Sequence, residues 1–382
     1  MSLSSKLAGK NSEDKELQEI LKEILPKKEK FKTVSGKEAF STNTVDKAPY
    51  NLSNKYYSSL VGIAFDYLAR FTVAHIITES KEKAYLNLAS NSALKILEKS
   101  LDDKLYKSIE EKYIEGLVIV MEYIHIQGGK LQDKDFIEHI NGCVFKAYRK
   151  FINKISWEKY WINKEYKIDI EELIKYTCFL AKLEQIIRSG ILPENPNTLL
   201  DDIEREIIVD IKQLYDIFVK DFTSIVYIDS LVIFNPKFGE LSSLLVGGAD
   251  ADIYIDGTLY DLKVKKDNGY KWQDVAQLVG YYMLSLITII FKEENSELSK
   301  YPISRLAFYK GRKGEIEYID VKDIGSKNII SALKKLDKLW NLKLNDELYK
   351  SLEEYIENLN AIEYKSKDIK WKIGIAKSEI LC

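Results

Sequence analysis

The sequence around Asp256-Gly257 places the strongest constraint on how this chain can fold. Two segments with alternating apolar residues flank this dipeptide, at 251–255 and 258–264. An Asp-Gly pair between such segments predicts a two-residue turn of type I′, because both turn residues must adopt positive φ angles. A two-residue turn also fixes the register of the two strands. We therefore expect a β-hairpin in which Ile255 faces Thr258.

This register places three charged side chains on one face of the hairpin. Asp252 is expected to face Asp261, and Lys263 follows two residues later on the same face. Directly opposed residues have Cβ atoms about 4.5–5.5 Å apart, close enough for two carboxylates to share a divalent cation. Without a cation, the two carboxylates repel each other by about 3 kcal/mol at an effective dielectric of roughly 20. The pattern therefore indicates a Mg²⁺ site, since Mg²⁺ prefers carboxylate oxygens.

Asp250 lies on the same face and is expected opposite Lys263. It is either the first metal ligand in place of Asp252 or an ion-pair partner that holds Lys263. We favour Asp252 because it is expected to oppose Asp261 directly. The alternative to a metal site is a solvent-facing edge hairpin whose polar face is acidic.

These residues resemble a known signature. Asp252, followed by 261–263 with the letters D-L-K, resembles the D…(D/E)-x-K motif of the PD-(D/E)XK nuclease superfamily. Gln277 and Tyr281 resemble the Q-x-x-x-Y motif of its RecB-like exonuclease branch, and their i, i+4 spacing puts them on one helix face. The resemblance covers about residues 235–323. It implies an α/β (α+β) fold with a restriction-endonuclease-like core, in which helices flank a mixed sheet.

The resemblance also implies a Mg²⁺-dependent deoxyribonuclease, with Mn²⁺ able to substitute. Asp252, Asp261 and the Leu262 carbonyl would hold one or two metal ions, Lys263 would activate the attacking water, and the Gln/Tyr pair would position the nucleic acid. Four residues close to the motif are candidate nucleic-acid contacts: Lys265, Lys266, Lys271 and Trp272. In the alternative, the lysines are simply solvated and the Trp272 ring caps the core.

Asp66 is a further candidate metal ligand. RecB-like enzymes carry a G-x-x-x-H motif on an early helix, and here the stretch 62–66 ends in Asp66 where that histidine would stand. A carboxylate is an acceptable magnesium ligand in place of imidazole. The alternative is a packed helix, because Phe65, Leu68 and Phe71 surround this position. The four-cysteine cluster of some relatives is absent, so no iron–sulfur cluster is expected.

Composition limits how the chain can bind nucleic acid. The 382 residues include 57 Lys+Arg and 59 Asp+Glu, for a net charge of −2. Attraction to DNA or a membrane by bulk charge is therefore excluded, and any phosphate site must be local. The chain has three scattered cysteines, no apolar N-terminal segment and no apolar run of about 18 residues. These features fit a cytoplasmic protein that contacts no membrane.

Periodicity predicts the organisation of the chain. Residues 1–45 read as a polar, mobile leader with one short helix that ends at Pro26, and 46–224 as a mainly helical region. Residues 225–323 form the expected nuclease core, with a strand at 225–234, a helix at 272–291 and a second strand pair at 304–310 and 315–321. Residues 324–382 read as a C-terminal helical segment.

Two other readings remain open. In the first alternative to the nuclease, the fold is catalytically inactive and serves as a binding or scaffold module. In the second, the protein is a nucleotidyltransferase that uses Asp250, Asp252 and Asp261 after Gly247-Gly248. The large helical region suits a homodimer contact or a partner protein. A nuclease without a motor motif resembles prokaryotic restriction, phage-defence or DNA-processing enzymes.

Overall fold

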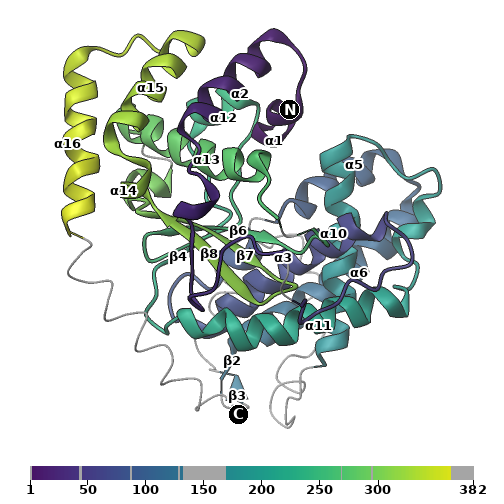
Figure 1. The fold of residues 1–382 in the computed structure, drawn as a ribbon. Helices are drawn as coiled ribbons and strands as arrows, with labels where there is room; N and C mark the ends of the chain where they lie inside the picture. The colour runs from purple at the N-terminus through teal and green to yellow at the C-terminus, as the bar shows by residue number, and fades with distance from the viewer. Residues whose placement is uncertain are drawn as a thin grey trace. The chain divides into compact units, whose positions relative to one another are not determined.

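The computed structural model describes residues 2–42, 45–86, 88–127, 130–131, 169–267, 269–293 and 296–362. They belong to two compact units, drawn together in Figure 1. Unit 1 comprises Met1–Tyr50 and Ile217–Cys382, and unit 2 comprises Asn51–Asp216. Cys143, Cys382 and the end of the expected C-terminal segment lie outside the described residues.

Unit 1 combines a sheet with helices. Its helices are α1 (Leu3–Ala8), α2 (Ser12–Ile24), α12 (Glu240–Val246), α13 (Trp272–Ile290), α14 (Val321–Ile324), α15 (Ser326–Trp340) and α16 (Asp346–Ile362), with short 3₁₀ turns at Lys28–Lys30, Thr223–Ile225 and Glu297–Ser299. Its strands are β1 (Lys32–Thr33), β4 (Val232–Phe234), β5 (Ile253–Ile255), β6 (Thr258–Lys263), β7 (Arg305–Lys310) and β8 (Glu315–Asp320).

The six strands form one mixed sheet in the order β1-β8-β7-β6-β5-β4. The pair β6–β7 is parallel, and the other neighbours are antiparallel. The expectation of a mixed sheet flanked by helices in an α/β fold is therefore confirmed. Because β5 and β6 are interior strands, the alternative of a solvent-facing edge hairpin is wrong.

The predicted hairpin forms in the predicted register. Ile253 pairs with Tyr260 and Ile255 pairs with Thr258. The turn residues Asp256 and Gly257 have φ angles of 45° and 87°, the positive values that a type I′ turn requires. The second strand pair, β7 and β8, and helix α13 also lie where the periodicity predicted them. The segment 225–234 is different, because only Val232–Phe234 is a strand.

Residues 1–45 do not form a mobile leader. Leu3 of α1 and Leu21 of α2 are each 1% exposed, and they belong to the same core cluster as the buried face of α13. Figure 1 shows α1, α2 and α13 gathered on one side of the sheet. The apolar stripe of α2 was visible in the sequence, but the surface that it covers is formed by residues more than 200 positions away.

Each face of the sheet has its own apolar cover. Tyr254, Leu259 and Phe308 belong to the cluster that contains α13. On the opposite face, the Phe222 ring lies 5.2 Å from that of Tyr260 and 5.1 Å from that of Tyr309, edge to face. Residues 261 and 263 lie on the same face of β6 as Leu259. Their side chains therefore point toward α13 and not toward bulk solvent.

Unit 2 is mainly helical in its described part. Its helices are α3 (Tyr57–Ile76), α4 (Lys83–Leu86), α5 (Ser90–Ser100), α6 (Asp103–His125), α10 (Ile170–Ser189) and most of α11 (Arg205–Asp221), with a 3₁₀ turn at Pro196–Leu199 and the short strands β2 (Ile126–Gln127) and β3 (Lys130–Leu131). Helix α10 packs against α3, α5 and α6.

Two helices are long and apolar enough to cross a membrane by length and composition alone. They are α3 and α13, and 72% of the apolar stretch is buried in each case. The expectation that no segment reaches this length of apolar sequence is therefore wrong for the described residues. Such burial is typical of helices at the centre of a packed core.

Candidate functional site

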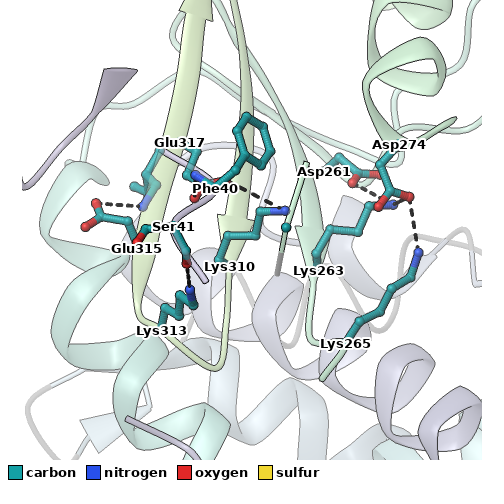
Figure 2. A network of polar contacts seen from close by, with 12 residues as sticks. Phe40, Ser41, Asp261, Lys263, Lys265, Asp274, Lys310, Lys313, Glu315 and Glu317 are labelled. Carbon is teal, nitrogen blue, oxygen red and sulfur yellow. Dashed lines mark hydrogen bonds and ion pairs between the residues drawn. The ribbon is translucent and has the colours of Figure 1, made fainter. Parts of the chain in front are cut away.

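The candidate site lies in unit 1, where β5 and β6 approach the first turns of α13. Strand β6 contributes Asp261 and Lys263. Both lie on the same face of the strand as the core residue Leu259, which is the face that packs against α13. The Lys263 ammonium lies 2.7 Å from Asp261 Oδ2 (Figure 2). The Asp261 side chain is 6% exposed and that of Lys263 is 12% exposed, so both charges are largely removed from water.

Asp252 contacts β6 in a different way from the one expected. The pairing of β5 with β6 stops at Ile253 and Tyr260, so Asp252 is not opposed to Asp261 across the ladder. Instead, its carboxylate accepts a hydrogen bond of 2.6 Å from the backbone N–H of Leu262. Burial lowers the pKa of Lys263, but the negative charges of nearby acids, chiefly Asp261 and then Asp274 and Asp252, outweigh burial and raise it.

Asp250 does not occupy the position predicted for it. Its backbone bridges to Lys237, which continues the pairing of β4 with β5. The expected opposition of Asp250 and Lys263 is therefore not formed, and Asp250 is exposed. Of the two candidates for the first metal ligand, Asp252 contacts β6 through the N–H of Leu262.

Gln277 and Tyr281 lie on one face of α13, as predicted. Gln277 Nε2 donates to Tyr281 Oη at 2.8 Å, and Lys263 Nζ donates to Gln277 Oε1 at 3.4 Å. The Tyr281 ring is buried and stacks on Phe238 at a centroid distance of 5.1 Å. Burial, with a contribution from Asp261 and Asp252, raises the pKa of Tyr281. Tyr281 therefore stays protonated and fixes the orientation of the Gln277 amide.

Asp274 is a member of the site that the sequence interpretation missed. It lies in the first turn of α13, with Oδ1 3.7 Å from Lys263 Nζ and 3.1 Å from Lys265 Nζ. Burial raises its pKa, but the two lysines outweigh burial and hold it below the usual range. The available signal was its position three residues before Gln277, which places both on one face of the helix.

Lys310 and Glu317 were also missed. Lys310 lies beside Lys263 in the parallel register of β6 and β7, and its Nζ is 3.7 Å from Glu317 Oε2 on β8. Both side chains are 3% exposed. Figure 2 shows Lys310 and Glu317 near Lys263 and Asp261. Burial lowers the pKa of Lys310 and raises that of Glu317, and Asp274 and Asp261 act on Lys310 as well. No sequence pattern reveals this neighbour, because it depends on the pairing of two strands that α13 separates.

The candidate nucleic-acid contacts have partners within unit 1. Lys265 contacts Asp274, Lys271 contacts Asp267 at 3.0 Å, and Lys266 lies 5.8 Å from the centre of the Tyr50 ring. Trp272 packs against the core, and the Lys22 ammonium lies 4.5 Å from its ring centre. This arrangement is the core-capping alternative for Trp272, whereas the Lys265 and Lys266 side chains remain accessible.

Asp66 belongs to unit 2. It lies on α3, and its Oδ2 is 2.6 Å from a guanidinium nitrogen of Arg70. Burial raises its pKa, with Arg70 as the main opposing influence. The helix is packed on most sides, which matches the alternative reading of this stretch.

The donor set of the site suits Mg²⁺. Asp261 Oδ2 is buried, and the Lys263 ammonium 2.7 Å away balances its charge. Mg²⁺ typically takes one or two protein carboxylates and keeps several water ligands, so Asp252 and Asp261 are sufficient. The described part of the chain contains no group of three or more His, Cys, Asp or Glu side chains that could hold a metal.

We compared the chain with protein-family models, curated proteins and solved structures. No family model, no curated protein and no solved structure matches it significantly.

Proposed function

We propose that this protein is a Mg²⁺-dependent nuclease of the PD-(D/E)XK type that hydrolyses phosphodiester bonds in DNA. One observation carries the proposal, namely the convergence of Asp252, Asp261 and Lys263 in front of the Gln277–Tyr281 pair. Burial of these charges beneath α13 does not stabilise the folded protein, because buried ionic groups are costly to desolvate. Their convergence is more readily explained by a need for the charges themselves.

The proposed roles follow from the contacts. Asp252 and Asp261 hold the metal, and the N–H of Leu262 orients the Asp252 carboxylate. A bound Mg²⁺ supplies charge neutralisation at the phosphate and a more acidic water. Lys263 orients that water and stabilises negative charge that develops on the phosphate.

The contacts suggest a more specific role for the Gln/Tyr pair than direct contact with the nucleic acid. Tyr281 Oη accepts from the Gln277 amide nitrogen, which leaves Gln277 Oε1 to accept from Lys263. The pair therefore holds the lysine ammonium in place.

The nucleotidyltransferase alternative has less support. It requires Asp250, Asp252 and Asp261 to act together, but Asp250 is exposed and its backbone bridges to Lys237. The binding-module alternative predicts that the acidic and basic side chains serve only to stabilise the fold.

The test is cleavage of linear and circular DNA, and of RNA, by the purified full-length chain with Mg²⁺, with Mn²⁺ and with a chelator. Cleavage should require the metal and should fall by at least about a hundredfold in Asp261→Asn and Lys263→Gln. Asp229→Asn, which changes an exposed aspartate of the same unit, serves as the matched control and should cleave at the wild-type rate. The proposal fails if the wild type cuts neither nucleic acid with either metal. Equal cleavage by wild type and Asp261→Asn would point to a contaminant.

A further inference from the structure

Lys263 lies between two carboxylates from different elements. Its ammonium is 2.7 Å from Asp261 Oδ2 on β6 and 3.7 Å from Asp274 Oδ1 on α13. Gln277 Oε1, one turn along the helix, accepts from the same ammonium at 3.4 Å. The Lys263 ammonium therefore has a close partner on β6 and two further polar partners, Asp274 and Gln277, on α13.

The first partner is also a proposed metal ligand. An ammonium at 2.7 Å from Asp261 Oδ2 occupies the side of the carboxylate that a divalent cation would approach. Two cations cannot share that oxygen without strong repulsion in a site with little water. Metal binding therefore requires Lys263 to move away from Asp261.

The second partner is suited to receive the lysine. Lys263 and Lys265 hold the pKa of Asp274 below its usual range against the effect of burial, so Asp274 is charged at neutral pH. Its carboxylate needs to approach by only about 1 Å to reach a typical ion-pair distance. Asp274 does not count as a third ligand, because no group of three acids in the described residues is placed to hold a metal.

We propose that Lys263 and the divalent cation compete for Asp261, and that Asp274 is the positioning residue that receives the Lys263 ammonium when the cation binds. This inference rests on the proposed function. In the metal-free protein, Lys263 neutralises Asp261 and keeps the site intact. In the metal-loaded protein, Asp274 and Gln277 hold the ammonium beside the metal, where it meets the attacking water.

The test measures Mn²⁺ binding to the full-length protein by calorimetric titration. Lys263→Gln removes the competitor and should bind Mn²⁺ about tenfold more tightly than the wild type. Asp274→Asn removes the alternative partner and should bind about tenfold more weakly. In the Lys263→Gln background, Asp274→Asn should change the affinity by less than about twofold, because no ammonium remains to be placed.

Lys300→Gln is the matched control for loss of one positive charge. Lys300 is an exposed residue between α13 and β7, and its replacement should leave the Mn²⁺ affinity within about twofold of the wild type. Thermal unfolding of each variant checks that it is folded. If Asp274→Asn alone does not fold, the comparison of Lys263→Gln with the wild type still decides whether the lysine competes.

The outcomes separate this inference from the proposed function. Weaker or unchanged binding by Lys263→Gln overturns the competition. If Asp274→Asn weakens Mn²⁺ binding equally in the wild type and in Lys263→Gln, Asp274 does not act through the lysine and is only a structural residue. The expected coupling without any cleavage of nucleic acid supports the competition and contradicts the nuclease. If neither the wild type nor Lys263→Gln binds Mn²⁺, both proposals fail.

Discussion

The backbone N–H of Leu262 donates a hydrogen bond of 2.6 Å to the carboxylate of Asp252. This contact joins the end of β5 to the middle of the Asp-x-Lys motif on β6. It replaces the direct opposition of Asp252 and Asp261 that an uninterrupted hairpin would give. Asp252 therefore reaches the motif because the chain bends away from the ladder at this residue, and not because the ladder continues.

The first prediction separates Asp252 from Asp250. We expect Asp252→Asn to reduce metal-dependent cleavage by at least about a hundredfold, because the variant loses an anionic ligand. Asp250→Asn should retain activity within about twofold, because Asp250 is exposed and its backbone bridges to Lys237. Initial cleavage rates at saturating Mg²⁺ measure the difference. The opposite order of effects would move the metal site to Asp250.

The hairpin shows how far local sequence predicts structure. The Asp256-Gly257 turn and the pairing of Ile255 with Thr258 follow from backbone rules over a few residues, and both are confirmed. The bend at Asp252 does not follow from such rules. It reflects the two edges of β5, because pairing on the β4 edge continues to Asp250 whereas pairing with β6 ends at Ile253.

The residues missed in the site have a similar explanation. Asp274 is near the motif in sequence, but its role depends on the direction in which α13 leaves the sheet. Lys310 becomes a neighbour of Lys263 only because β6 and β7 pair in parallel. Long-range pairing of this kind is not encoded in the periodicity of either segment. The pairing of β1, at Lys32–Thr33, with β8 is another example.

A second prediction concerns the buried pair Lys310 and Glu317. Lys310→Met should lower the free energy of unfolding by about 3–5 kcal/mol at neutral pH, because it leaves a buried carboxylate without its cation. Glu317 Oε1 still accepts from the Phe40 N–H at 2.7 Å. Urea unfolding followed by circular dichroism measures the change.

The pH dependence of this variant provides an independent check. Burial already raises the pKa of Glu317, and loss of Lys310 removes the main opposing influence, so its pKa in the folded protein rises further above the unfolded value. The contribution of Glu317 to stability should then be fully present at acidic pH and should be lost as the pH rises through the folded pKa. In Lys310→Met/Glu317→Gln this loss should disappear, since no carboxylate remains. If Lys310→Met does not lose stability with rising pH relative to the double variant, the assignment of the pair is contradicted.

A third prediction tests the place of the N-terminal helices in the core. Leu21 is 1% exposed and belongs to the same cluster as α13. Leu21→Ala should destabilise unit 1 by about 2–5 kcal/mol, the usual cost of such a cavity. Lys15→Ala changes an exposed position of the same helix and should alter stability by no more than about 0.5 kcal/mol. Thermal unfolding distinguishes the two, and a neutral Leu21→Ala would restore the view of residues 1–45 as a leader.

The fourth prediction concerns Gly116 on α6 and Tyr176 on α10, both within unit 2. A Cβ atom at Gly116 would lie 1.8 Å from Tyr176 Cδ2, so the two helices approach each other at a position that only glycine permits. Alanine normally stabilises a helix by about 0.5–1 kcal/mol relative to glycine. Here we expect Gly116→Ala to destabilise the protein by about 1–3 kcal/mol, because the ring must move out of a packed core.

A double-mutant cycle isolates this effect from helix propensity. Tyr176→Ala removes the ring and is itself destabilising by about 3–5 kcal/mol, as for other buried aromatic residues. In that background Gly116→Ala has no atom to clash with and should increase the free energy of unfolding. A change in sign between the two backgrounds, measured by urea unfolding, assigns the glycine to the close approach of the two helices. The same destabilisation in both would mean that the Tyr176 ring is not what requires a glycine at position 116.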